Sequence, residues 1–282
     1  MLEFYKKHLQ RGLFYFGKYD RSHSEPYSAL MEALQYFCDD LLLRGEGTIA
    51  NYKCRIKEAV GDEGILLTNA IHSLPLIIGQ QSVITECNGR NAKNRFNYVL
   101  IKFIKAICSA DFPLILILED LQWMDSSSYD IISELVKDKS QGKNLMLLAT
   151  YRENEVGNEH MVKSLQKLIM QQNVKMTEIN LRNLDEGTVN EILSDSLSCT
   201  PFDAYALTAL ILKKTKGNPF FVKQVLTSLY EEGLIYLCSN KCKWDWKDTI
   251  FDEMDVTESV IELIRNKMLA FDDPTLMALR VA

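Results

Sequence analysis

The feature that most constrains the fold is an apolar run that ends in two adjacent carboxylates, from Phe112 to Asp120. The run does not alternate with polar residues, so it predicts a strand covered on both faces, as in the middle of a parallel sheet. Glu119 and Asp120 end this strand on the edge where ligands bind in open α/β folds. The two acids either form part of a metal and water site, or they merely start a solvated loop or cap the next helix.

A second buried strand is predicted at residues 145–152, after a helix at residues 126–136. Three serines, which favour helix N-caps, precede apolar residues at helical spacing, and Gly142 ends the crossover. A strand, a helix and a second strand in this order imply a right-handed parallel unit. The polar ends of both strands then lie on one edge of the sheet.

This topology places Arg152 near Glu119 and Asp120. Carboxylates bind Mg²⁺ directly or through water and polarise an attacking water, and an arginine neutralises charge on a transferred phosphoryl group. The three residues therefore suit phosphate chemistry. The alternative is that Arg152 is a surface residue that pairs with Glu153 or Glu155.

Periodicity predicts the remaining elements less sharply. We expect helices at residues 27–41 and 92–107, and further helices that begin near residues 184, 219 and 255. Short strands are expected at residues 13–16 and 174–181, and a β-hairpin at residues 234–237 and 243–246.

Composition narrows the class of protein. The 282 residues are 47% hydrophobic with a formal net charge of −6, which argues against attraction to nucleic acid or anionic membranes as the main activity. The first residues lack the apolar core of a signal peptide, and no apolar run approaches the roughly 20 residues of a membrane-spanning helix. We expect a soluble, cytoplasmic protein whose seven cysteines are reduced.

Other chemistries find little support in the sequence. Cys238 and Cys242 are close together, but no second pair of ligands accompanies them and the four histidines are dispersed, so a hairpin with two incidental thiols is favoured over a metal site. The Gly-x-Ser-x-Gly motif of serine hydrolases is absent.

The segment from Leu114 to Asp125 resembles the Walker B segment of STAND-class AAA-type ATPases. More narrowly, it resembles the origin-recognition-complex-like ATPase module of large multidomain serine/threonine and histidine sensor kinases. Further matching segments follow in the module's order and cover nearly the whole chain: Phe16 to Asp20, Pro26 to Leu30, Asn94 to Asn97, Ala149 to Val156 and Gly217 to Phe221.

The resemblance implies ATP and Mg²⁺ as ligands and assigns roles to individual residues. Glu119 matches the Mg²⁺-binding Walker B position, and Asp120 matches the adjacent metal-binding and water-activating acid. Arg152 matches the sensor arginine at a strand end. Gly217, Asn218 and Pro219 match the lid motif that lies against adenine, although Asn-Pro is also an ordinary helix start.

Two departures from the family pattern matter. Position 119 carries Glu where the family usually has Asp, which moves the carboxylate outward by one methylene. The phosphate-binding Gly-x-x-x-x-Gly-Lys-[Ser/Thr] loop is found nowhere in the 282 residues. We therefore expect a fragment whose central strand and phosphate loop lie upstream of Met1.

The predicted fold is α/β: an incomplete P-loop NTPase-type parallel sheet at residues 1–182, a helical lid at 183–233 and a truncated winged-helix-like segment at 234–282. We expect a nucleotide-dependent signalling switch that contacts other domains of its polypeptide or signalling partners. Hydrolysis of ATP by this chain alone is not expected. A degenerate, non-catalytic scaffold for protein contacts is the alternative. DNA binding by Lys241, Lys243 and Lys247 is disfavoured because acidic residues surround these lysines.

Overall fold

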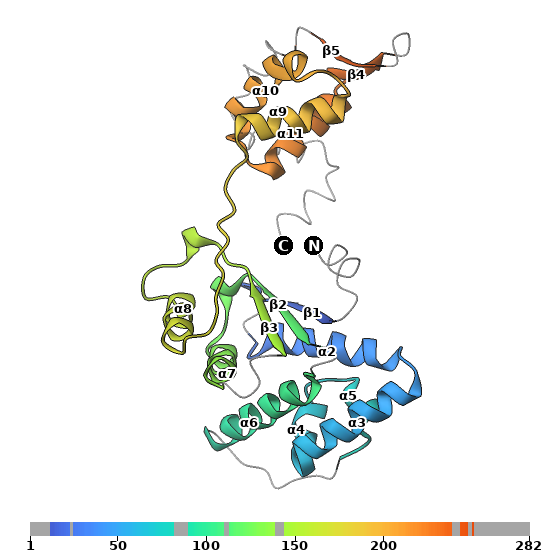
Figure 1. Cartoon of the computed structure of the whole chain (residues 1–282), viewed down its shortest axis with the longest axis vertical. Helices are drawn as coiled ribbons and strands as arrows, with labels where there is room; N and C mark the ends of the chain where they lie inside the picture. Colours follow the sequence, from blue (N-terminus) through green and yellow to red (C-terminus); the bar gives the residue numbers. More distant parts are fainter. Residues whose placement is uncertain are drawn as a thin grey trace, which may run out of the picture. The chain divides into compact units, whose positions relative to one another are not determined.

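A computed structural model describes residues 12–22, 25–81, 90–109, 113–138, 144–238, 243–247 and 250. The chain forms two compact units, Met1–Thr177 and Glu178–Ala282, and each is described separately (Figure 1). Each unit has a hydrophobic core of its own.

The first unit is built on a three-stranded parallel sheet. Its strands are β1 (Leu13–Lys18), β2 (Leu114–Glu119) and β3 (Leu145–Ala149), in the order β1-β2-β3. The buried central position of β2 confirms the strand predicted from the unbroken apolar run. Strand β2 pairs with β1 on one side and with β3 on the other, so β1 and β3 are the edge strands of the described sheet. A further strand could pair only with one of these two edge strands.

Helices cover this sheet. Within its described residues, the first unit has the helices α2 (Ser28–Leu42), α3 (Glu46–Val60), α4 (Ile65–Thr68), α5 (Leu74–Ile78), α6 (Arg90–Ile107), α7 (Ser126–Lys137) and α8 (Met161–Gln171). Short 3₁₀ turns lie between some of these elements: η1 (Gly61–Gly64) joins α3 to α4, η2 (Leu121–Trp123) lies between β2 and α7, and η3 (Glu153–Glu155) lies between β3 and α8. Helix α2 packs on β1 and β2, whereas α7 packs on α6 and α8. The predicted parallel strand-helix-strand unit is thus present as β2, α7 and β3. The expectation that the second strand is buried is wrong, because the residues of β3 are half-buried or exposed and Met146 is 54% exposed.

The core of this unit begins where α2 meets the sheet. The apolar stripe of α2 includes Leu30, Leu34 and Phe37, all of which are fully buried. The ring of Phe37 lies edge-on to Tyr15 of β1, at 5.5 Å between centroids. The apolar residues at helical spacing in α2 therefore pack against the sheet, as expected.

The expected strand at residues 174–181 is wrong. Residues 174–185 have neither helical nor strand structure, and the side chains of Ile179 and Leu181 are 76% and 90% exposed. Alternating apolar residues form a strand only when a neighbouring strand supplies hydrogen bonds and a core covers one face. This segment has neither among the described residues.

The described part of the second unit combines three helices with a hairpin. Helices α9 (Glu186–Leu197), α10 (Pro201–Thr215) and α11 (Pro219–Glu231) share one core with the antiparallel strands β4 (Ile235–Cys238) and β5 (Lys243–Trp246). The hairpin and the helices that begin near residues 184 and 219 are confirmed. The helix expected near residue 255 lies outside the described residues.

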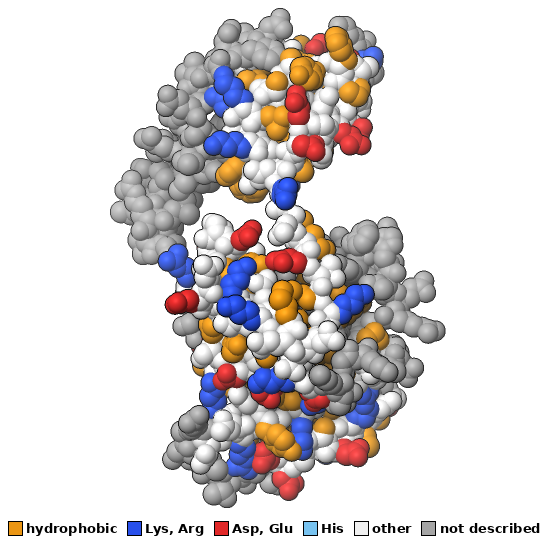
Figure 2. All heavy atoms as spheres, turned by 60° about the vertical axis from the view of Figure 1, so that its left-hand side comes forward, with side chains coloured by type: hydrophobic (Ala, Val, Ile, Leu, Met, Phe, Trp, Pro, Cys, Tyr) orange, Lys and Arg blue, Asp and Glu red, His pale blue; other side chains and the backbone are white. Residues whose placement is uncertain are grey.

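The outer surface carries both signs of charge. Figure 2 shows lysines and arginines interspersed with acidic side chains on the visible face of each unit, in keeping with the modest net charge. No helix among the described residues is both long and apolar enough to cross a membrane.

Candidate functional site

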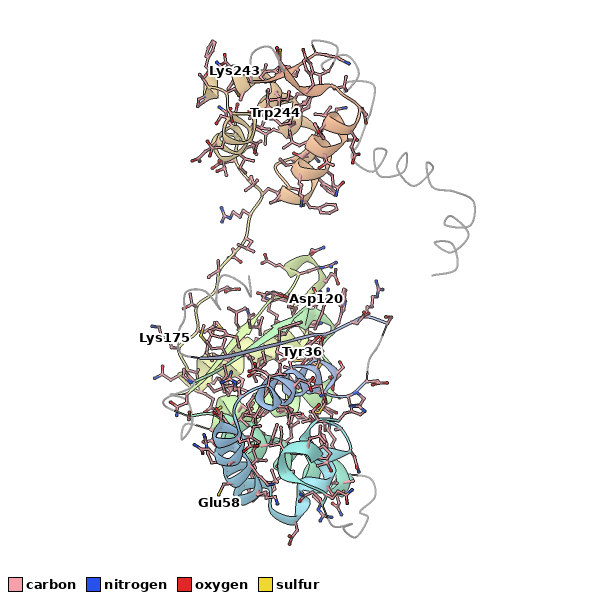
Figure 3. The ribbon with its side chains drawn as sticks, turned by 90° about the vertical axis from the view of Figure 1, so that its right-hand side faces the viewer. Tyr36, Glu58, Asp120, Lys175, Lys243 and Trp244 are labelled. Atoms are coloured by element: carbon pink, nitrogen blue, oxygen red, sulfur yellow. The ribbon has the colours of Figure 1, made fainter. Side chains whose placement is uncertain are left out.

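The carboxyl ends of the three parallel strands bring polar residues to one edge of the sheet. Lys18 ends β1 directly opposite Glu119, which ends β2. Beyond β3, the backbone of Thr150 continues the pairing by donating its N–H to the Leu118 carbonyl at 3.0 Å. Figure 3 shows Asp120 at this end of the sheet. The expectation that the polar strand ends share one edge is therefore confirmed.

Asp120 is the centre of this cluster. One of its carboxylate oxygens lies 3.3 Å from the Lys18 Nζ, and the other lies 3.8 Å from the Arg152 Nε. The side chain is only 16% exposed, and Gln122 donates a hydrogen bond to it at 3.0 Å. Two cations and an amide thus surround one carboxylate.

The backbone of Asp120 has an unusual conformation. Its φ of 57° and ψ of 48° lie in the left-handed region, which Asp and Asn tolerate better than other non-glycine residues. This residue ends the strand and starts the turn η2. Its N–H reaches the Thr150 hydroxyl at 3.4 Å, and the N–H of Leu121 donates to the Thr150 carbonyl at 2.9 Å. Both bonds join the start of the turn to the end of β3.

Arg152 contacts both Glu155 and Asp120. Its guanidinium donates to Glu155 at 3.1 Å and lies 5.2 Å above the ring of Trp123, while its Nε approaches Asp120. The side chain is 55% exposed, so the guanidinium is accessible to a ligand. A surface ion pair and a place in the cluster are therefore compatible.

Glu119 differs from its neighbour. Its side chain is exposed, and within the described parts of the chain its carboxylate has no ion-pair partner. Two adjacent carboxylates offer the hard oxygen ligands that Mg²⁺ prefers. The described residues contain no group of three or more His, Cys, Asp or Glu that could hold a metal. The site therefore fits Mg²⁺ only if phosphate oxygens and water supply the remaining ligands.

Asp125, the last residue of the Walker B-like segment, caps a helix. Its carboxylate accepts hydrogen bonds from the N–H groups of Ser127 and Ser128, both at 2.9 Å, and from the N–H of Tyr27 at 3.2 Å. It therefore fixes the start of α7 and joins it to the chain before α2. The cap of α7 is therefore Asp125 and not the acidic pair, and the Asp120 side chain makes no cap hydrogen bond to η2.

Gly217, Asn218 and Pro219 belong to the second unit, at the start of α11. Gly217 has a φ of 75°, and a Cβ there would lie 2.0 Å from the Leu184 carbonyl oxygen. Asn218 caps α11 by accepting from the N–H groups of Phe220 and Phe221. Pro219 lies in the first turn of α11, a position that favours proline, so each residue of the motif has a structural role.

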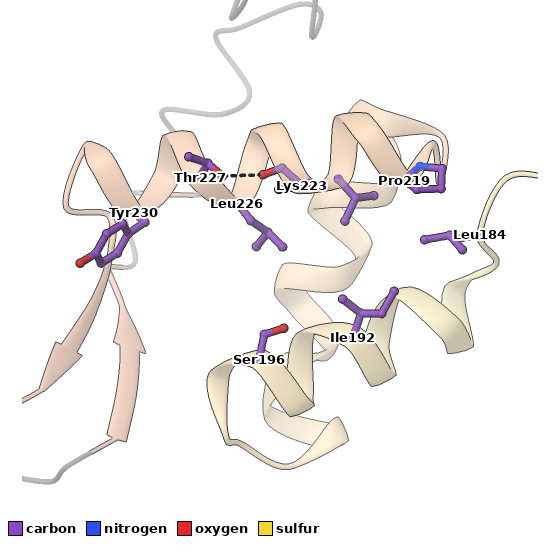
Figure 4. A pocket seen from close by; sticks show the side chains of 9 residues that line it. Leu184, Ile192, Ser196, Pro219, Lys223, Leu226, Thr227 and Tyr230 are labelled. Atoms are coloured by element: carbon purple, nitrogen blue, oxygen red, sulfur yellow. Dashed lines mark hydrogen bonds between the residues drawn. The ribbon is translucent and has the colours of Figure 1, made fainter. Parts of the chain in front are cut away.

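Pro219 also borders an apolar groove of about 440 Å³ between α9 and α11 (Figure 4). Its other lining residues include Leu184, Ile192, Leu226 and Tyr230.

Several residues of the sheet-edge cluster were not singled out from the sequence. Lys18 could have been predicted, because it follows an expected strand, and the carboxyl ends of parallel strands lie on the same edge of the sheet as the two acids. Gln122 and Thr150 carry no distinctive pattern. His160 is distant in sequence from the cluster and is brought to it by the tertiary fold. Its Nε2 donates to the Gln122 carbonyl at 3.0 Å, and its Nδ1 accepts from the Val162 N–H at 3.2 Å.

Comparison with known proteins places this geometry in a family. The AAA ATPase domain family matches residues 1–148, more than half of the chain. Hybrid signal transduction histidine kinase G of Dictyostelium discoideum is 24% identical over an alignment of 339 residues including gaps. The alignment covers 98% of this chain and 10% of that protein. Peroxide stress-activated histidine kinase mak3 of Schizosaccharomyces pombe is 24% identical over 197 residues, which cover 70% of this chain and 8% of that protein.

The chain thus spans about a tenth of the length of these curated relatives. No solved structure matches it. The family match covers β1, β2, both acids, the helix α7 and β3 except its last residue, and its extent identifies the chain as a member of the AAA ATPase domain family.

Proposed function

We propose that this chain is a STAND-class ATPase module that works as a nucleotide-dependent switch within a larger signalling protein. The observation that carries the proposal is the meeting of Asp120 and Arg152 at the carboxyl edge of a parallel sheet in a chain of this family. The similarity to parts of two signalling histidine kinases supports the signalling context. Its partners would be other domains of the same polypeptide or signalling proteins.

The acids would bind the metal and activate water. Glu119 and Asp120 would hold Mg²⁺, which when bound neutralises charge on the phosphates of ATP. Asp120 would also accept a proton from the attacking water, a role that suits a carboxylate that is only 16% exposed at the edge of the sheet. Glu119 offers an exposed carboxylate with a longer reach than the usual Asp.

The basic residues would respond to the nucleotide. Arg152 is half-exposed and can turn from Glu155 and Asp120 toward a phosphate oxygen, where its charge stabilises the transition state. In the second unit, Gly217, Asn218 and Pro219 would cover the adenine. Movement of this lid between nucleotide states would carry the signal.

The 282 residues do not contain the phosphate loop, so the backbone donors and the lysine that grip the β- and γ-phosphates are missing from this sequence. We therefore expect weak ATP binding and no hydrolysis by this chain alone. The same observation favours the second candidate, a non-catalytic scaffold for protein contacts. An in-frame strand and Gly-x-x-x-x-Gly-Lys-[Ser/Thr] motif in the DNA upstream of Met1 would argue against the scaffold.

The test is Asp120→Asn in the longest polypeptide that the gene encodes. We expect nucleotide binding to be retained and hydrolysis to fall by at least ~100-fold, the size expected for loss of a positioned base. Asp130→Asn is the matched control, because Asp130 is also paired with a lysine but lies on α7. Unchanged hydrolysis in Asp120→Asn would remove Asp120 from its role, and a wild-type protein that neither binds nor hydrolyses ATP would favour the scaffold.

A further inference from the structure

Gln122 is a buried amide in the middle of the sheet-edge cluster. It lies in the turn η2, and the residue is only 6% exposed. Its Nε2 donates to a carboxylate oxygen of Asp120 at 3.0 Å, and its Oε1 accepts from the backbone N–H of Arg152 at 3.1 Å. One side chain therefore bridges the acid after β2 and the arginine after β3.

The orientation of this amide is fixed by its partners. The N–H of Arg152 requires an acceptor, so the carbonyl oxygen of the side chain faces Arg152 and the NH₂ group faces Asp120. A hydrogen bond from an amide to a carboxylate is charge-assisted and stronger than one between neutral groups. Because Asp120 accepts this bond at the oxygen that lies nearest Arg152, the amide restricts rotation of the carboxylate.

The backbone of Gln122 is held from another element. Its carbonyl accepts from the Nε2 of His160, at the start of α8. The Nδ1 of His160 accepts from the Val162 N–H, so the imidazole must carry its proton on Nε2. The turn is thus fixed to α8 on one side, while its side chain is directed at the strand ends.

We infer that Gln122 is a positioning residue that sets the distance and orientation of Asp120 relative to Arg152. This inference rests on the proposed ATPase function. Gln122 would act through Asp120 and the backbone of Arg152, and we assign it no contact with the nucleotide. Residues that orient a site's primary groups typically contribute about 10–100-fold to activity.

The test compares Gln122→Met with a matched substitution elsewhere in the first unit, in the longest polypeptide that the gene encodes. Methionine has a similar size but makes neither hydrogen bond. The control is Gln35→Met, because Gln35 also accepts from a backbone N–H, that of His72 at 2.8 Å, and donates to a side chain, Ser73 Oγ at 2.7 Å. Gln35 lies on α2, outside the cluster.

We expect Gln122→Met to lower kcat for ATP hydrolysis by about 10–100-fold with KM within about 2-fold of wild type. Gln35→Met should reduce thermal stability to a similar extent and leave kcat unchanged. In an Asp120→Asn background, Gln122→Met should lower kcat by less than about 3-fold further, because the two residues act as a unit. A purely structural role would not produce this non-additivity.

A second variant covers the case in which Gln122→Met does not fold. Gln122→Glu keeps an acceptor for Arg152 but places a second carboxylate against Asp120, and we expect the same loss of kcat. The inference is overturned if either folded variant hydrolyses ATP like Gln35→Met, or if its loss persists in full without Asp120. Failure of the ATPase proposal itself is recognised separately, by unchanged hydrolysis in the single Asp120→Asn variant or by a wild-type protein without activity.

Discussion

Replacing Gly17 with alanine tests the packing that places β1, and with it Lys18, at the site. Gly17 is buried in β1 under α2, and an added Cβ would lie 1.8 Å from the carbonyl oxygen of Ala29 and 2.5 Å from its carbonyl carbon. Ordinary contacts of a Cβ begin at 3.4 Å. The opposing atoms belong to the helix backbone, so no side-chain rotation can relieve the contact.

The magnitude follows from the displacement. Helix α2 or strand β1 must move until a contact of 1.8 Å becomes one of at least 3.4 Å, which separates Leu30 and Leu34 from the sheet. Overpacking of a core costs about 1–3 kcal/mol, and a backbone clash belongs at the upper end, about 3 kcal/mol. For a unit of this size, that loss lowers the Tm by about 6–12 °C.

Calorimetry or circular dichroism of the 282-residue chain would measure the change. Gly47→Ala is the control, because Gly47 lies in the first turns of α3 and a methyl group added there would have no atom within 4 Å. Alanine at this position should stabilise the first unit by about 0.4–1 kcal/mol. A Gly17→Ala variant that melts at the wild-type temperature would show that α2 does not approach β1 this closely.

Three further predictions concern stability. Asp125→Ala removes the acceptor for the first turn of α7 and for the Tyr27 N–H, so urea unfolding should show a loss of about 2 kcal/mol, and a loss below a few tenths would contradict the cap. Asn218→Ala should lower the stability of the second unit by about 1 kcal/mol, again measured by urea unfolding. Burial raises the pKa of the Cys108 thiol from 9.0 to about 12, so the free energy of unfolding should be unaffected below pH 9 and fall as the pH rises from there toward 12. Cys108→Ala should flatten that decline in unfolding experiments at increasing pH, and an unchanged slope would exclude this thiol as a contributor.

Continuous apolar runs were the most reliable guide to the fold. The run before Glu119 predicted β2 because a strand covered on both faces needs no polar positions. The second run predicted the position of β3 but not its burial, because the residues of β3 are half-buried or exposed. Alternation misled at residues 174–181, where the pattern of a half-buried strand exists without a neighbouring strand or a core to cover it among the described residues. The local pattern of apolar residues shows that a segment can form a strand, but whether it pairs in a sheet depends on the rest of the chain.

Only the part of the candidate site that follows from the topology of the parallel strands was predictable from the sequence. Parallel strands forced Asp120 and Arg152 onto one edge, and the structure brings them to 3.8 Å. Gln122 belongs to the Walker B-like segment, but an isolated amide or imidazole has no periodic or spacing signal that would predict its partners. The bonds that join Gln122 to Arg152 and to His160 connect residues 30 and 38 positions apart. The roles assigned to the site residues remain predictions.

The left-handed backbone of Asp120 limits how this position could change during evolution. Few residues other than Asn and Gly could replace Asp there without conformational strain, whereas Glu119 lies in ordinary extended strand. Asparagine or glycine at position 120 would therefore be tolerated more readily than a bulky or β-branched residue. Such a substitution would remove the carboxylate from the cluster while leaving the architecture intact.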